Sequence, residues 1–84
     1  MKNNIKEMIS KSLKKLRTDK GMTQSELSKQ CGVDISTIVR YEKNNVTMQI
    51  DTLIKIVESY GIDMFIFFNQ IVAKTQENDN NSNK

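Results

Sequence analysis

Apolar residues recur at intervals of three and four along most of this 84-residue chain, which is the spacing of one face of an α-helix. Glycines and small polar residues separate the apolar runs, and these residue types commonly stop or cap helices. The pattern predicts an all-α fold of five helices around one core. The helices are expected at about residues 4–20, 23–31, 34–43, 50–60 and 64–74.

The first predicted helix has one apolar face, which suits packing on a core. That face holds Ile5, Ile9, Leu13 and Leu16. Basic residues lie elsewhere on the helix, namely Lys11, Lys14 and Lys15. Gly21 follows as a C-terminal stop. We expect most of this helix to be scaffold with a solvated face.

Residues 22–45 have the pattern of two short helices joined by a tight turn. Thr23 and Glu26 have the spacing of a capping box, in which each side chain pairs with a backbone N–H of the first turn. Gly32 permits the left-handed backbone that a tight corner between helices needs. Asp34 is placed to cap the next helix. The pattern therefore predicts a helix-turn-helix.

The third predicted helix has two unlike faces. Ile38 and Tyr41 lie on one side, which is enough to dock the helix on a core. The opposite side carries Ile35, Ser36, Val39, Arg40 and Lys43. A purely structural helix would rarely place two β-branched aliphatic residues in water, whereas a DNA major groove offers thymine methyls to aliphatics and guanine acceptors to arginine. This face is predicted to contact DNA.

The fourth predicted helix carries one apolar stripe and ends at Gly61. The stripe consists of Ile50, Leu53, Ile54, Val57 and Tyr60. A polar turn precedes it, and the N-cap stays open between Thr47 and Gln49.

The fifth segment is apolar around most of its circumference. One buried face accounts for Met64, Phe67, Phe68 and Ile71, which leaves Phe65, Ile66 and Val72 outside it. Either the core is deep here or a second chain covers this surface, and we favour a homodimer. The expected interface is Met64, Phe65, Ile66, Phe68 and Val72. Because the run MFIFF has strong strand propensity, a short strand at the start of the segment is the alternative to a helix.

Composition indicates where the folded domain ends, and the distribution of charge indicates the kind of partner that it binds. Residues 75–84 hold no apolar residue, so they are expected to be a disordered polar tail after a domain of residues 1–74. Residues 1–45 carry ten basic and five acidic residues, whereas residues 46–84 carry three and five. The basic half contains the helix-turn-helix, as expected of a polyanion binder, although solvated lysine-rich helices are also common.

Other features limit the function classes. There is no run of about 18 apolar residues and no secretory signal, and the single cysteine cannot form an internal disulfide, so a cytoplasmic protein is expected. With no histidine and no second cysteine, Cys31 lacks metal or catalytic partners and is expected to be a small core residue. We expect no enzymatic activity, no bound metal, no cofactor, no membrane association and no small-molecule ligand.

Three stretches carry a resemblance to a known family: LRTDKGMTQSELSKQCGV, DISTIVRYEKN and IDTLIKIVESYGIDMFIFF. These stretches contain GMTQ-x-x-L, a turn glycine, an aliphatic-x-x-Tyr-Glu third helix and a leucine-rich fourth helix. Together these features resemble the phage-repressor-like helix-turn-helix family, the Xre or Cro/CI type. The resemblance covers Leu16–Phe68, about two thirds of the chain. Within the family the chain is most similar to the small controller proteins of restriction-modification operons.

The resemblance implies roles for individual residues. Gln24 is expected to bind a DNA phosphate at the start of the second helix, and the residues of the third helix are expected to face base edges or the adjoining backbone. The expected DNA-binding residues are Gln24, Ser25, Ile35, Ser36, Thr37, Val39, Arg40, Lys43, Asn44 and Asn45. Arg17 and Glu42 match a structural ion pair that joins the first helix to the third.

One departure from the family pattern concerns Ile35, where members often carry Gln or Arg. Contact with a thymine methyl is the expected substitute, which predicts an A·T-containing half-site. The predicted function is sequence-specific transcriptional regulation by a homodimer whose third helices lie about 34 Å apart on an inverted repeat. The alternative is an antitoxin-like module whose apolar C-terminal segment binds a different protein. RNA binding would favour exposed aromatic platforms, which the sequence lacks.

Overall fold

The residues that the structure describes form five helices and no strand. This computed structural model describes the backbone of residues 5–43 and 47–82, and side chains as far as Ala73. The helices are α1 (Ile5–Asp19), α2 (Gln24–Cys31), α3 (Ile35–Lys43), α4 (Ile50–Glu58) and α5 (Met64–Ser82). The predicted all-α fold class is confirmed.

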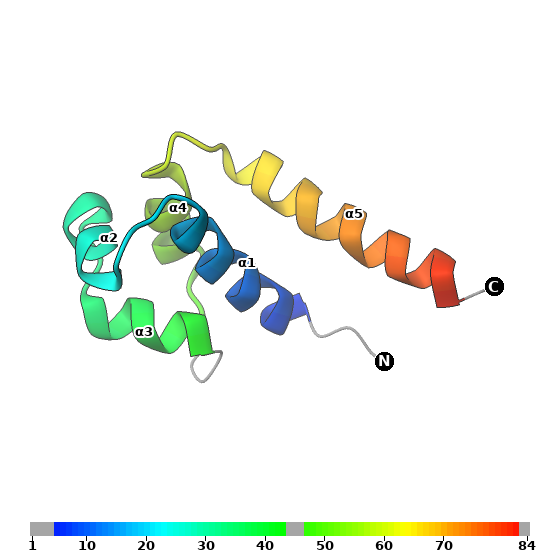
Figure 1. The fold of residues 1–84 in the computed structure, drawn as a ribbon, viewed down its shortest axis with the longest axis horizontal. Helices are drawn as coiled ribbons and strands as arrows, with labels where there is room; N and C mark the ends of the chain where they lie inside the picture. Colours follow the sequence, from blue (N-terminus) through cyan, green and yellow to red (C-terminus); the bar gives the residue numbers. More distant parts are fainter. Residues whose placement is uncertain (1–4, 44–46, 83–84) are drawn as a thin grey trace.

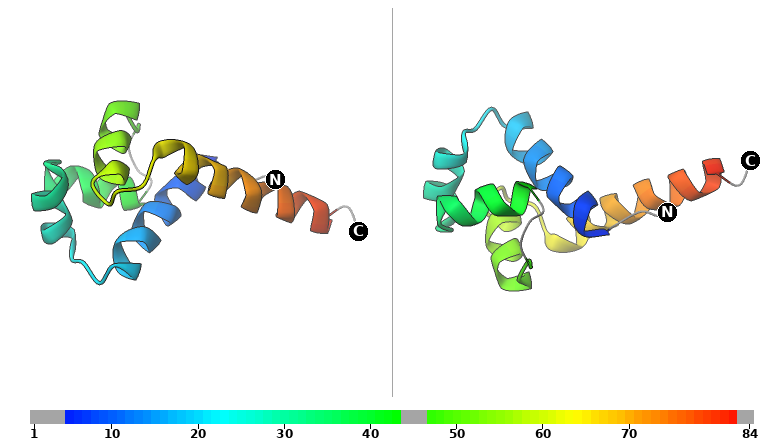
Figure 2. Two further views of the ribbon diagram at one scale, coloured as in Figure 1. Left: turned by 90° about the horizontal axis from the view of Figure 1, so that it is seen from above. Right: turned by 90° about the horizontal axis from the view of Figure 1, so that it is seen from below.

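The helices pack as a small bundle from which the last helix projects (Figure 1). α3 packs against both α1 and α2, and α4 lies between α2 and α5. α5 also contacts α1, and its second half runs beyond the bundle in every view (Figure 2). α2 and α3 lie at one end of the molecule and the C-terminal half of α5 at the other, which gives extents of 45 × 25 × 23 Å.

One core joins all five helices. Its buried apolar residues are Ile9, Leu13, Leu27, Val33, Ile38, Tyr41, Leu53, Ile56, Val57, Met64, Phe67 and Ile71. The apolar stripes read from the sequence are mostly buried, but Ile5 and Ile50 at the first turns of α1 and α4 are 52% and 55% exposed. Ile56 lay outside the predicted stripe yet is only 2% exposed, because α4 is covered by α2 on one side and α5 on another.

Local capping fixes where three helices begin. Thr23 and Glu26 form the predicted capping box, with the Glu26 N–H donating to Thr23 Oγ1 at 3.0 Å and the Thr23 N–H to Glu26 Oε1 at 2.8 Å. Asp34 accepts from the Ser36 N–H at 3.1 Å, and Asp63 accepts from the Phe65 N–H at 2.7 Å. These bonds satisfy N–H groups that have no partner inside a helix.

The start of α4 is stabilised from another helix. Its N-cap is Gln49, which makes no side-chain cap hydrogen bond. Instead the Gln49 N–H donates to the Tyr41 hydroxyl at 2.9 Å, so a buried residue of α3 binds the backbone next to α4. Between the two candidates left open by the sequence, the structure selects Gln49 over Thr47.

α5 is a helix from its first residue, so the alternative of a strand over residues 64–68 is wrong. Its backbone stays helical through Ser82, where the sequence led us to expect a disordered tail from residue 75. Residues 74–82 contain neither glycine nor proline, and extending an existing helix adds one hydrogen bond for each residue fixed. Within the described part of the chain, no helix is long and apolar enough to cross a membrane.

Candidate nucleic-acid interface

The corner between α2 and α3 is fixed by backbone geometry and one buried residue. Gly32 has a φ of 76°, and its N–H donates to the Ser28 carbonyl at 2.9 Å. The Ser28 hydroxyl donates to the Val33 carbonyl at 2.6 Å, and Val33 is buried in the core. Cys31 is half-buried and packs against that core, as a small core residue would. The direction of α3 is therefore set by contacts on both sides of the turn.

α3 has the two faces that the sequence predicted. Ile38 and Tyr41 are 1% and 4% exposed and dock the helix on the core. Ile35 is 42% exposed, and the exposed residues of the same helix also include Ser36, Arg40 and Lys43. Thr37 and Val39 are half-buried at the margins. A basic and partly apolar surface thus faces outward along α3.

The first turn of α3 is tied to its N-cap. The Ser36 hydroxyl donates to Asp34 Oδ2, as does the Ser36 N–H. These two bonds, the hydroxyl first, hold the pKa of the Asp34 carboxyl below its ordinary value, and the charge of Arg40 lowers it further. Because its proton is engaged by Asp34, Ser36 presents an oxygen that can accept a hydrogen bond.

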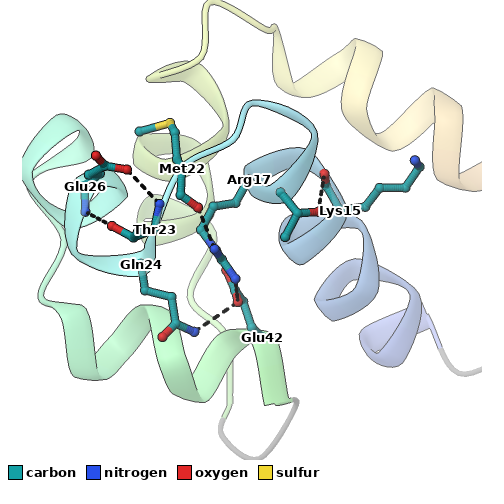
Figure 3. A network of polar contacts seen from close by, with 8 residues as sticks. Lys15, Arg17, Met22, Thr23, Gln24, Glu26 and Glu42 are labelled. Atoms are coloured by element: carbon teal, nitrogen blue, oxygen red, sulfur yellow. Dashed lines mark hydrogen bonds and ion pairs between the residues drawn. The ribbon is translucent and has the colours of Figure 1, made fainter.

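Arg17 and Glu42 form the expected ion pair between α1 and α3 (Figure 3). The pair is bidentate, with Arg17 Nε 2.8 Å from Glu42 Oε2 and Nη2 3.0 Å from Oε1. The two side chains are 11% and 5% exposed. Hydrogen bonding to Glu42 raises the pKa of Arg17 above its ordinary value. Arg17 Nη1 also donates to the Met22 carbonyl at 2.7 Å, so one guanidinium holds α3 and the approach to α2.

Gln24 is held by this ion pair, which the sequence did not reveal. It is half-buried at the first position of α2, and its Nε2 donates to Glu42 Oε1 at 3.1 Å (Figure 3). A primary amide carries two N–H bonds, so a second N–H of Gln24 remains for another acceptor. Ser25, the neighbouring candidate, is exposed.

A polar hollow of about 210 Å³ extends the α3 surface toward α4. Thr37 and Arg40 line it from α3, Thr47 from the segment before α4, and Thr52 from the first turn of α4. Thr47 and Thr52 were missed as candidates because no local motif marks them. The hydrogen bond from the Gln49 N–H to the Tyr41 hydroxyl holds this part of the chain next to α3. The candidates Asn44 and Asn45 lie outside the described residues.

The predicted interface residues of α5 separate into two groups. Met64 is only 9% exposed and belongs to the core, so it is not available on the outer face. Phe68 is half-buried against the same core. Phe65, Ile66 and Val72 are 81%, 53% and 46% exposed, and we call these three residues the outer face of α5. α5 packs on α1 and α4, so this apolar surface is separate from the α3 surface.

Comparison with solved structures finds the same arrangement in a controller protein. The wild-type restriction-modification controller protein C.Esp1396I matches with a TM-score of 0.79 and 25% identity, over 90% of this chain and 99% of that one. The C.Esp1396I tetramer in complex with its natural 35 base-pair operator matches with a TM-score of 0.77 and 26% identity, over 86% and 95% of the two chains.

Comparison with curated proteins finds antitoxins. Antitoxin HipB of Escherichia coli O6:H1 (strain CFT073) is 34% identical over 56 residues, which is 67% of this chain and 60% of that protein. HipB of strain K12 is also 34% identical over 56 residues and matched over 64% of its length. The chain therefore spans less than two thirds of these relatives.

The family model for helix-turn-helix proteins, HTH_3, matches residues 13–67. That match runs from α1 to the start of α5 and contains α2, the Gly32 corner and α3. Since it covers more than half of the chain, the protein belongs to the HTH_3 family of Xre-type helix-turn-helix proteins.

Proposed function

We propose that the protein is a transcriptional regulator that binds a specific DNA sequence as a homodimer, in the manner of a restriction-modification controller or a phage-type repressor. The observation that supports this most is the outward face of α3. A buried anchor of Ile38 and Tyr41 leaves Ile35, Ser36 and Arg40 projecting from a rigidly seated helix. Side chains held in this way can read base edges in a major groove.

Each exposed group has a distinct partner in the proposal. Arg40 donates to guanine acceptors, Ile35 packs on a thymine methyl, and Ser36 accepts from a base donor. Thr37 and Val39 contact the groove wall at the margins of the helix. Phosphate contacts come from Gln24, Ser25, Lys43, Asn44 and Asn45, which set the register of the protein on the duplex.

The proposed homodimer uses the outer face of α5. Three exposed apolar side chains on a single helix form a surface that water solvates poorly. The related C.Esp1396I binds its operator as a tetramer. Two copies joined through α5 would place their α3 helices about 34 Å apart, one turn of DNA, on an inverted repeat.

Regulation in this proposal has no catalytic step and no cofactor. The protein acts in the cytoplasm, where its concentration controls the fraction of dimer and therefore the occupancy of the operator. The residues 1–74 serve as one DNA-binding and dimerisation domain.

Selection of bound sequences from a random DNA pool tests the function directly. We expect an inverted repeat with half-sites one turn apart and an A·T pair opposite Ile35. Arg40→Ala should then weaken operator binding by about 1–3 kcal/mol and relax preference at one base position. A pool that shows no enrichment would overturn the proposal, and an equal loss on all sequences would make Arg40 a phosphate contact.

An antitoxin-like role is the second candidate, and the identity with HipB supports it. In that role the outer face of α5 binds a different protein. The mass of the purified protein separates the two roles. A stable dimer means that the apolar face is already covered by a second copy, whereas a monomer that aggregates alone favours a different partner.

A further inference from the structure

A hollow of about 380 Å³ lies beside the Arg17–Glu42 pair. α1 lines it with Lys14 and Arg17, α2 with Gln24, and α3 with Glu42 and Lys43. Three helices thus meet at one concave surface, to which α1 and α3 bring basic groups and α2 brings an amide. Figure 3 shows how Arg17, Gln24 and Glu42 converge there.

The charges in this hollow do not cancel. Glu42 is already paired with Arg17 through two hydrogen bonds, so these two residues together contribute no net charge. Lys14 and Lys43 are exposed, and neither has an ion-pair partner among the described residues. The hollow therefore has a formal excess of two positive charges, one from α1 and one from α3.

Lys14 differs from other lysines of the same helix. Lys11 pairs with Glu7 at 3.6 Å, and Lys15 pairs with Asp19 at 3.1 Å. Lys15 lines a different hollow, of about 110 Å³, between α1 and α5. Two lysines adjacent in sequence thus lie on different sides of α1, and Lys14 is the one that shares a surface with Gln24.

We propose that this hollow seats one phosphate of the DNA backbone and that Lys14 is a DNA-contacting residue. The inference rests on the proposed function and adds α1 to the DNA-binding surface. A phosphodiester carries one negative charge and oxygens that accept hydrogen bonds. The ammonium groups of Lys14 and Lys43 supply the charge, and the second N–H of Gln24 supplies a directed donor, since its first N–H is held by Glu42.

Under this proposal the Arg17–Glu42 ion pair has a second role in addition to joining α1 to α3. Glu42 neutralises Arg17 and orients the Gln24 amide, so the phosphate meets one oriented N–H donor and two exposed ammonium groups. Contacts of this kind position the protein on the duplex without reading sequence. Lys14 must therefore strengthen binding to every duplex to the same extent.

Lys14→Gln and Lys15→Gln form a matched pair for the test, because both remove one positive charge from exposed positions of α1. Binding to the selected operator and to a scrambled duplex is measured from about 50 to 200 mM salt. Lys14→Gln should weaken both complexes several-fold and by the same factor. Its salt slope should fall by about one, so that the loss of affinity across this range is about fourfold smaller than in the wild type.

Lys15→Gln should leave the salt slope unchanged, and Lys14→Arg should retain binding. Equal effects of Lys14→Gln and Lys15→Gln would overturn the proposal, because general electrostatics would then explain both. A loss confined to the operator would also overturn it. These failures differ from failure of the proposed function, in which the wild-type protein itself would show no steep salt dependence and no preference for a sequence.

Discussion

The two tyrosines of the protein differ in what their hydroxyl groups contact. Tyr41 is 4% exposed, and its hydroxyl accepts from the Gln49 N–H at 2.9 Å. Tyr60 is half-buried two residues after the end of α4, and its hydroxyl oxygen is buried without a hydrogen-bond partner among the described residues. The same functional group is therefore a capping acceptor at one site and an unsatisfied polar group at the other.

Tyr41→Phe should destabilise the protein by about 1 kcal/mol, because it leaves the N–H of the α4 N-cap without its acceptor. Tyr60→Phe is the matched control and should be neutral or stabilising, because it removes a buried hydroxyl that has no partner. The free energies of unfolding in urea measure both changes. Equal destabilisation by the two variants would contradict this assignment of the hydroxyls.

The pH dependence of stability should also reflect Tyr60. Burial raises the pKa of Tyr60 to about 12, although the charge of Arg17 opposes the shift. In the unfolded chain the phenol ionises near pH 10. The folded protein therefore keeps a proton that the unfolded chain releases, so this contribution is complete below about pH 10 and is lost as the pH rises toward 12.

Ultraviolet titration of the phenolate tests this shift. The wild-type protein should show a transition near pH 12 that is absent in Tyr60→Phe. The variant should also lose less stability than the wild type between about pH 10 and 12. A transition at the ordinary tyrosine value that disappears in Tyr60→Phe would show that burial does not control this group.

At the scale of single helices, the sequence predicts where a helix begins better than it predicts which contacts join one helix to another. The caps at Thr23, Asp34 and Asp63 could be read because donor and acceptor lie within three residues of each other. The cap of α4 could not, because its acceptor Tyr41 is eight residues away. The Gln24–Glu42 bond spans 18 residues and was missed for the same reason.

Thr23→Ala should destabilise the protein by about 1 kcal/mol, because it removes the threonine half of the α2 capping box. Ser25→Ala is the control for stability, since Ser25 is exposed in the same turn and makes no side-chain hydrogen bond among the described residues. Thermal unfolding compares the two variants. If Thr23→Ala had the same melting temperature as Ser25→Ala and the wild type, the capping box would not be what fixes the start of α2.

For the whole molecule, periodicity predicted the five helices and most of the core but not which apolar faces remain open. Ile5 and Ile50 fit their stripes yet are exposed, and both lie in the first turn of their helix. Met64 is buried while Phe65 beside it is 81% exposed. Sequence spacing identifies an apolar face, whereas burial depends on which neighbour reaches it. The outer face of α5 is one such apolar face that the single chain leaves exposed.

Phe65→Glu should convert the proposed dimer into monomers, because it places a charge at the most exposed apolar residue of that face. Gln70→Glu is the control, since it changes charge by the same amount at another exposed position of α5. Light scattering should give a dimer mass for the wild type and Gln70→Glu and a monomer mass for Phe65→Glu.

Because the α3 surface is separate from α5, the monomeric Phe65→Glu variant should still bind a single half-site as the wild-type subunit does. Its affinity for the full operator should fall, since the two half-sites no longer bind one linked pair of subunits. An unchanged dimer mass would move the interface away from α5, and a monomer that lost half-site binding as well would mean that Phe65 supports the fold rather than the dimer.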